Sequence, residues 1–234
     1  MSSIKTNVIE WKNVGTNDIL WVYPYEDLRW GTLVIVHEYE MAIFMRDGKL
    51  YDTLRPGRHK LSTQNIPLLT KAYSLVMGYG ETPFKAKIIF VALKQFKGNF
   101  GLNTRVRLSQ NTSWLTELRA CGNYWFRIAD PVLFLTQLAG ANQYFTTNDV
   151  NNFIRNHFVE GLMQELAKYD ALTIYTKLSD ISSKVKSGVV QYVFKNLGLE
   201  LIDLKFGGVQ LPLLEKMEKE DATYGLPLMA AMQS

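Results

Sequence analysis

The first 130 residues alternate between short apolar runs and turn residues, as strands of a β-sheet do. Runs rich in β-branched and aromatic residues occur at 19–24, 32–38 and 40–46, and each has the length of a strand. The run at 84–93 starts with alternating polar and apolar residues and then becomes wholly apolar, which predicts a strand covered on both faces. At 120–128 every second residue is small or apolar, which predicts one buried face.

Two dipeptides in this region are typical of turns. Asp47-Gly48 is the dipeptide typical of a two-residue hairpin, and Pro56-Gly57 is typical of a type II turn. Together they predict a meander of short antiparallel strands. Neither turn contains a nucleophile, a metal ligand or a phosphate-binding loop, so we assign these residues a structural role. A β-branched residue in place of Gly57 is expected to lower stability or assembly without abolishing a specific activity.

The periodicity changes after residue 130. Pro131 suits the first position of a short helix that ends at Gly140. Apolar residues at helical spacing predict a long helix over 146–169, with Phe153 on its apolar face, and another over 179–196, with Tyr192 on its apolar face. A closing strand follows at 199–206. The fold class is therefore α+β, with a β-rich half that holds a twisted mixed sheet and then helix, helix and strand.

This order divides the chain into three predicted parts. Residues 1–130 form a β-rich subdomain, residues 131–210 form a helical α/β subdomain, and residues 211–234 form a short C-terminal helix and tail. The composition is that of an ordinary globular protein, with 47% hydrophobic and 21% charged residues. Because no apolar run is long enough to cross a bilayer, we expect a cytoplasmic protein, with peripheral contact at the inner face of the membrane left open.

The residues that usually carry catalysis are sparse. Cys121 is the single cysteine, and its place in a strand predicts a small buried residue. His37 and His59 lie apart from any cluster of metal ligands, and His157 lies on the apolar stripe of the long helix. Glu40 shares a predicted strand face with Glu38, which is more typical of a solvated face than of a catalytic pair. We therefore expect no enzyme, no catalytic or metal-binding residue, no cofactor and no small-molecule substrate.

One stretch has a distinctive charge pattern. No acidic residue occurs from Thr82 to Trp114, while basic and aromatic residues alternate there. Such a segment can bind an anionic surface, either nucleic acid or acidic lipid. The simpler alternative, which we favour, is that these side chains cover the solvent faces of strands and protect an edge from aggregation. The candidate contacts are Lys85, Lys87, Lys94, Lys97, Arg105 and Arg107.

The segment 33–69 carries a family resemblance. It runs through an apolar strand, a glutamate, a second strand, a glycine turn, an apolar-x-Pro-Gly element and a last strand. This order resembles the opening of the SPFH domain, the superfamily of stomatin, prohibitin, flotillin and HflK, and is closest to its soluble virion-core-like branch. The resemblance extends over about 8–207, because "YWFRIADP" precedes the helices and "GLELIDLKF" follows them.

The resemblance implies a non-enzymatic scaffold that self-associates into a ring or cage-like homo-oligomer, usually at a membrane. It supplies no catalytic residues. The expected partners are other copies of the chain and a membrane surface or membrane proteins, with nucleic acid less favoured. Apolar Leu213, Leu214 and Met217 after the closing strand are candidate assembly contacts. The alternative function is a module that binds an anionic surface through 85–107.

Overall fold

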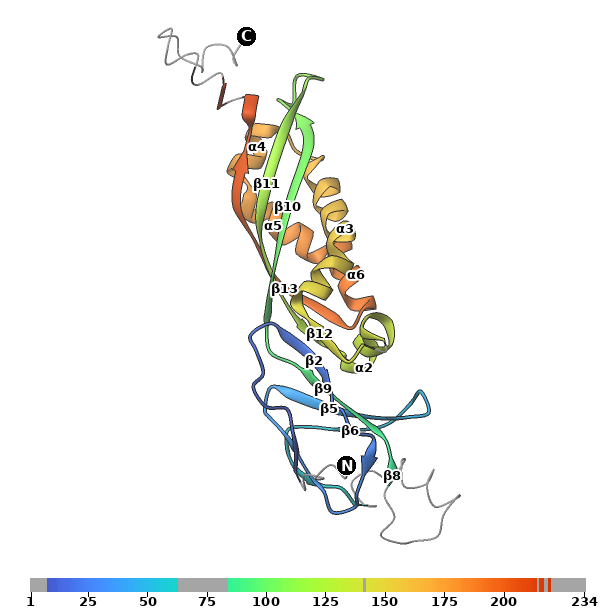
Figure 1. The fold of residues 1–234 in the computed structure, drawn as a ribbon. Helices are drawn as coiled ribbons and strands as arrows, with labels where there is room; N and C mark the ends of the chain where they lie inside the picture. Colours follow the sequence, from blue (N-terminus) through green and yellow to red (C-terminus); the bar gives the residue numbers. More distant parts are fainter. Residues whose placement is uncertain (1–7, 63–83, 141, 214, 217–218, 220–234) are drawn as a thin grey trace. The chain divides into compact units, whose positions relative to one another are not determined.

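A computed structural model describes residues 8–62, 84–140, 142–213, 215, 216 and 219. The predicted α+β class is confirmed (Figure 1). Two compact units are distinguished. The first comprises the described residues of Met1–Phe96, Arg127–Val150 and Asn196–Leu199, and the second those of Lys97–Phe126, Asn151–Lys195 and Glu200–Ser234. The subdomain boundaries predicted at residues 130 and 210 stay a prediction.

The described residues of the first unit form three small sheets. The largest has the antiparallel order β12-β2-β9-β5-β6, the second has the order β1-β4-β7, and the third pairs β3 with β8. The strands are β1 (Val8–Glu10), β2 (Asp18–Val22), β3 (Asp27–Leu28), β4 (Leu33–Val36), β5 (Glu40–Arg46), β6 (Lys49–Leu54), β7 (Gly57–Lys60), β8 (Phe84–Lys85), β9 (Lys87–Ala92) and β12 (Tyr144–Thr146). Five of the six residues of β9 are buried, which confirms the prediction that this strand is covered on both faces.

The Asp47-Gly48 turn is a two-residue hairpin, as predicted. It joins β5 to β6, with Arg46 paired to Lys49. Asp47 has φ 49° and Gly48 has φ 73°, and positive φ at both central residues is the requirement of a type I′ turn. This turn sets the register of the pairs next to it, and an irregularity between Phe44 and Met45 then shifts the register of the remaining β5–β6 pairs.

The Pro56-Gly57 turn has a different role from the one predicted. Gly57 has φ 138°, which is positive as expected but beyond the about +80° of a type II turn. The strands on its two sides belong to different sheets, because β6 pairs with β5 whereas β7 pairs with β4. The meander predicted through this turn is therefore wrong, and Pro56-Gly57 carries the chain from one sheet to another.

A short helix with a wide turn follows the β-rich region in the first unit. Helix α2 (Pro131–Phe134) starts with a proline and is capped by Asp130, whose carboxylate accepts the amide of Leu133 at 2.9 Å. It continues into the π-helical turn η1 (Leu135–Ala139), where the amide of Gly140 donates to the carbonyl of Leu135 at 2.8 Å. The predicted helix over 131–140 thus exists, with a wider last turn.

The second unit is a sheet of three long strands with helices. The strand order is β10-β11-β13, and helices α3, α5 and α6 run along this sheet (Figure 1). The elements are β10 (Phe96–Arg107), β11 (Leu115–Ile128), β13 (Leu199–Gln210), α3 (Thr147–Leu166), α4 (Ala171–Thr176), α5 (Leu178–Ser187) and α6 (Val189–Asn196); the first residues of α3 belong to the first unit. Alternate residues of β11 are buried, as predicted for 120–128.

An aromatic cluster forms the core of the second unit. Tyr124 of β11 packs against Phe158 of α3, with ring centroids 4.5 Å apart, and against Phe194 of α6 at 6.0 Å. Phe100 of β10 contacts the same Phe158 at 5.5 Å and Phe206 of β13 at 5.6 Å. The cluster therefore connects all three strands to two helices.

Two glycines make room for this cluster. A Cβ at Gly98 of β10 would overlap the ring of Tyr124, and one at Gly122 of β11 would overlap the ring of Phe100 and the carbonyl of Lys205. Each ring thus lies over a glycine of the neighbouring strand. The close approach explains why these two positions within the sheet hold residues with low strand propensity.

The predicted helix over 179–196 is wrong as a single element. The structure breaks it at Gly188 into α5 and α6. The break changes which residues face the core, so Tyr192, predicted on the apolar face, is 68% exposed and Phe194 is buried instead. A glycine in a helical pattern permits such a change of direction, and the i, i+4 spacing does not carry across it.

Three further predictions of burial are corrected. On α3, His157 is exposed and Phe153 is 50% exposed, because the buried stripe is narrower than the apolar pattern. Cys121 is exposed, since it alternates with the buried residues of β11. Glu40, predicted on a solvated face, is fully buried.

We predict that the two glycines of β10 respond very differently to alanine. At Gly98 the added methyl overlaps the buried Tyr124 ring, whereas at Gly101 no atom lies within 4 Å of an added Cβ. Gly98→Ala should therefore destabilise the protein by about 1–3 kcal/mol, the usual range for overpacking, and Gly101→Ala should change stability little. Urea unfolding followed by circular dichroism measures both; equal midpoints for the two variants would contradict the packing described.

Candidate functional site

The structure divides the six basic residues of the acid-free stretch between the two units. Those of the first unit are Lys85, Lys87 and Lys94, and those of the second are Lys97, Arg105 and Arg107. The ammonium of Lys94 donates to the carbonyl of Gly15 at 2.7 Å, so this lysine holds a loop in place. The stretch is therefore not a continuous patch on one unit.

The outward face of the second unit's sheet centres on Trp125. The ammonium of Lys97 lies 5.8 Å from its ring centroid and that of Lys205 lies 5.7 Å from it, which are cation–π distances. These contacts place side chains of β10, β11 and β13 on the same face. Since Trp125 is only partly exposed, the two lysine stems cover part of the ring.

Basic residues outnumber acidic ones on this face. The guanidinium of Arg119 donates to Glu117 at 2.9 Å, and the amide of Asn103 donates to the same oxygen at 2.8 Å. Hydrogen bonds from these two side chains, that of Arg119 foremost, lower the pKa of Glu117. Neither Arg105 nor Arg107 forms an ion pair among the described residues, although the charge of Arg105 also lowers the pKa of Glu117, and both arginines are exposed. The face is therefore basic, with its excess charge on β10.

The two outer strands of this sheet each border a groove. Strand β10 and helix α3 line a groove of about 400 Å³ that includes Leu102, Asn156 and Met163. Strand β13 and helix α5 line another of about 390 Å³ that includes Ser183 and Leu204. Both strands have 12 residues, and in the described structure each has a strand partner on one side only.

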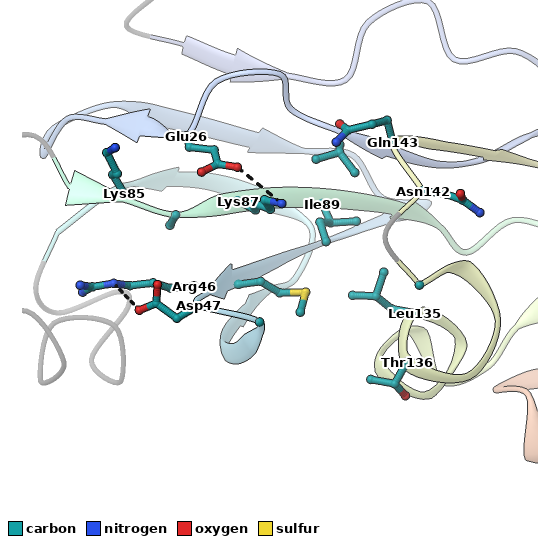
Figure 2. A pocket seen from close by; sticks show the side chains of 15 residues that line it. Glu26, Arg46, Asp47, Lys85, Lys87, Ile89, Leu135, Thr136, Asn142 and Gln143 are labelled. Atoms are coloured by element: carbon teal, nitrogen blue, oxygen red, sulfur yellow. Dashed lines mark ion pairs between the residues drawn. The ribbon is translucent and has the colours of Figure 1, made fainter.

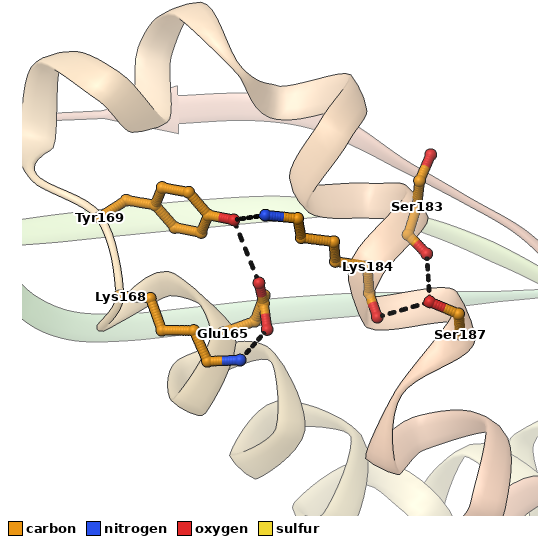
Figure 3. A network of polar contacts seen from close by, with 6 residues as sticks. All are labelled: Glu165, Lys168, Tyr169, Ser183, Lys184 and Ser187. Atoms are coloured by element: carbon orange, nitrogen blue, oxygen red, sulfur yellow. Dashed lines mark hydrogen bonds and ion pairs between the residues drawn. The ribbon is translucent and has the colours of Figure 1, made fainter.

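A polar network fixes helix α5 against the end of α3 (Figure 3). The ammonium of Lys184 donates to the phenol oxygen of Tyr169 at 2.6 Å, and that hydroxyl donates to Glu165 at 3.2 Å. Lys168 pairs with the same carboxylate at 2.5 Å. The hydrogen bond with Tyr169 raises the pKa of Lys184. The network holds one wall of the β13–α5 groove in place.

Asp170 forms a second anchor at the start of α4. Its two carboxylate oxygens accept the amide and the hydroxyl of Thr173, each at 2.8 Å, and its backbone bridges to that of Arg107 on β10. Burial would raise the pKa of Asp170, but hydrogen bonds to its carboxylate, those from Thr173 foremost, outweigh burial and hold the pKa below its usual value. The cap thereby joins the helical region to the β10 strand.

In the first unit, His37 forms a cluster that the sequence did not predict. Its Nδ1 lies 3.0 Å from Oε2 of Glu40, and its Nε2 lies 3.3 Å from Oε1 of Glu10. Tyr39 stacks on the imidazole with centroids 5.5 Å apart. In the sequence, only the i, i+3 spacing of His37 and Glu40 indicated this cluster, because Glu10 comes from the distant strand β1. With one carboxylate at each ring nitrogen, the cluster connects β1 to the start of β5.

The other predicted site residues have the following places. The turn residues Asp47, Gly48, Pro56 and Gly57 lie in the connections described above. Leu213 is 41% exposed, while Leu214 and Met217 lie outside the described residues. No group of three metal-ligating side chains that could hold a metal ion is found in the described part of the chain. Of the helices described, none has the length and apolar character to cross a bilayer.

Comparison with known proteins identifies the family. The family model for "SPFH domain-Band 7 family" matches residues 20–225. The chain belongs to this family. The SPFH chain is also 18% identical over 225 residues to the "Uncharacterized protein YdjI" of Bacillus subtilis (strain 168), covering 94% of this chain and 69% of that protein. The SPFH domain indicates a scaffold-type family, whose members are generally non-enzymatic.

We predict that the stabilising effect of Asp170 depends on pH. Because its folded-state pKa is lowered below its usual value of about 3.9, the carboxylate stabilises the fold fully above that value. Its contribution is lost as the pH falls through the folded-state pKa. Asp170→Ala should cost about 1–2 kcal/mol at pH 7, as for other N-caps, and less at pH 3.

Urea midpoints at both pH values measure this difference. Asp180→Ala is the matched control, because Asp180 is an exposed acid in the first turn of the neighbouring helix α5. A cost at pH 3 as large as that at pH 7 would show that the ionised carboxylate is not the stabilising species.

Proposed function

We propose that this SPFH chain is a non-enzymatic scaffold whose copies assemble into a ring or cage-like homo-oligomer. The observation that carries the proposal is the pair of outer strands β10 and β13 in the second unit, each 12 residues long and each beside a groove. An outer strand presents unpaired backbone donors and acceptors, which favours pairing with another chain.

The two edges differ, and the difference favours a closed ring. One edge combines β10 with α3, and the other combines β13 with α5. Contact between the β10 edge of one copy and the β13 edge of the next is head-to-tail, and such contacts give rings when the rotation closes. Each copy then extends the sheet of its neighbour. A membrane surface, or proteins in it, is the further partner that the family relationship favours.

We predict that blocking either groove stops assembly. Asn156→Arg places a long cationic side chain in the β10–α3 groove, and Ser183→Arg does so in the β13–α5 groove; both positions are exposed. In sedimentation velocity at micromolar concentration, the unmodified chain should form a discrete large particle and each variant a monomer of about 27 kDa. The matched controls are Asn152→Arg on α3 and Ser187→Arg on α5, exposed positions outside the grooves.

Mixing the two blocked variants tests the head-to-tail arrangement. The intact β13 edge of Asn156→Arg should pair with the intact β10 edge of Ser183→Arg, giving a heterodimer and nothing larger. An interface between the same edge of two copies would instead let one of the variants dimerise on its own. If the unmodified chain is a monomer, or if both groove variants assemble as it does, the proposal fails.

A second candidate function is binding to an anionic surface, here through the outward face of the second unit's sheet. The observation that favours it is the excess of basic residues around Trp125, where neither Arg105 nor Arg107 forms an ion pair among the described residues. Basic side chains beside a tryptophan suit an acidic lipid surface, where each cation contributes about 1 kcal/mol.

We predict that Arg105→Glu combined with Arg107→Glu removes binding to vesicles that contain an acidic phospholipid. Binding of the unmodified chain should weaken as salt rises, because exposed charges are screened. Lys195→Glu, an exposed charge reversal on α6, is the control and should bind normally. Co-sedimentation measures all three. Unchanged binding by the double variant, or a preference for single-stranded nucleic acid over the vesicles, would contradict this function.

A further inference from the structure

A pocket lies at one end of the five-stranded sheet of the first unit (Figure 2). Its volume is about 450 Å³, within the range of about 300–1,000 Å³ that small-molecule sites occupy. Four segments contribute to it: the region after β2, the β5–β6 hairpin, strands β8 and β9, and the π-helical turn η1 with the residues after it. All of them belong to the first unit.

The floor of the pocket is apolar. Val22 and Ile89 are paired neighbours on β2 and β9, and both are buried. Leu135, which is 2% exposed, begins the π-helical turn on the opposite side. Figure 2 shows Ile89 and Leu135 pointing toward each other across the hollow, and Met45 of β5 also lines it. These side chains would surround an apolar body of a few carbon atoms.

The rim of the pocket is charged. Lys87 pairs with Glu26, with 3.5 Å between ammonium and carboxylate, and Arg46 pairs with Asp47 at 3.2 Å. Lys85 lines the same pocket and has no ion-pair partner among the described residues. Among the lining residues, three cations therefore accompany two carboxylates, which leaves one positive charge. That charge is complementary to an anionic ligand.

A neutral donor supplements the charged rim. Thr136, in the π-helical turn, and Gln143 both line the pocket. The hydroxyl of Thr136 donates to the carbonyl of Leu133 at 3.1 Å, so of these two side chains it is the amide of Gln143 that can donate to an oxygen anion. Wide turns of this kind occur frequently at functional sites, and here η1 supplies both Leu135 of the floor and Thr136 of the rim.

We propose that this pocket binds a small amphipathic anion, with its carboxylate or phosphate group at the lysine rim and a short apolar body on the Val22–Ile89–Leu135 floor. The proposal goes beyond the scaffold function and does not rest on it, because assembly was argued from the second unit alone. It adds a ligand site to a chain for which the sequence predicted none. An occupant would connect β9 to η1 and so stabilise the first unit.

Titration calorimetry with four eight-carbon probes tests the site on the full chain. Octanoate and octyl phosphate should bind, and comparing them shows which anionic group the rim prefers. Octanol should bind at least about tenfold more weakly, a difference of ~1.4 kcal/mol, and octylammonium should not bind. Absence of octanoate and octyl phosphate binding at millimolar concentration would overturn the proposal, and so would octanol binding as tight as octanoate.

Two variants with matched controls locate the binding. Thr136→Trp places an indole over the floor and should abolish octanoate binding, whereas Gln137→Trp, at the next and equally exposed position outside the pocket, should not. Lys85→Glu should weaken octanoate binding at least about tenfold, and Lys49→Glu, on the exposed strand β6, should leave it unchanged. Octanoate binding that survives both Thr136→Trp and Lys85→Glu would place the ligand elsewhere and overturn the assignment.

Discussion

The reciprocal packing of two aromatic rings over two glycines is the constraint on which the second unit depends. Tyr124 lies over Gly98, and Phe100 lies over Gly122, each ring crossing to the neighbouring strand. Because the rings lie close to the backbone, they fit under Phe158 of α3. The phenol of Tyr124 donates to Asn151 of the same helix, and burial raises its pKa well above the usual value. The hydroxyl therefore stays protonated, and keeps donating its hydrogen bond, across the pH range in which proteins are usually studied.

This packing also determines which surfaces remain for partners. With one face of the sheet covered, the strands present their other face, around Trp125, and their two outer edges. The edges lie beside helices that are themselves anchored, α5 by the Lys184–Tyr169–Glu165 network and α3 by the aromatic cluster. An assembly interface built on these edges would thus be preformed, and preformed surfaces lose less entropy on association. The pocket of the first unit draws on another part of the chain, so ligand binding and assembly are separable properties.

Sequence patterns predicted those features whose causes are local. Asp47-Gly48 needs only its own φ preferences to form a hairpin, and Pro131 needs only its own ring to start α2. Pro56-Gly57 predicted a turn equally well. The sheet that the next strand joins, however, depends on that strand's distant partner, β4. Gly188 shows the same limit for helices, since the spacing of apolar residues does not distinguish a glycine inside a helix from a glycine that ends one. The candidate sites were harder still, because Glu10 contacts His37, and Lys85 lines the same pocket as Leu135, only after the sheets have formed.

The interleaving of the two units has a consequence for how this protein can be divided. The chain passes from one unit to the other after residues 96, 126, 150, 195 and 199. No single cleavage or gene fusion point releases either unit with all of its segments. A single recombination point therefore cannot replace one whole unit and leave the other unchanged.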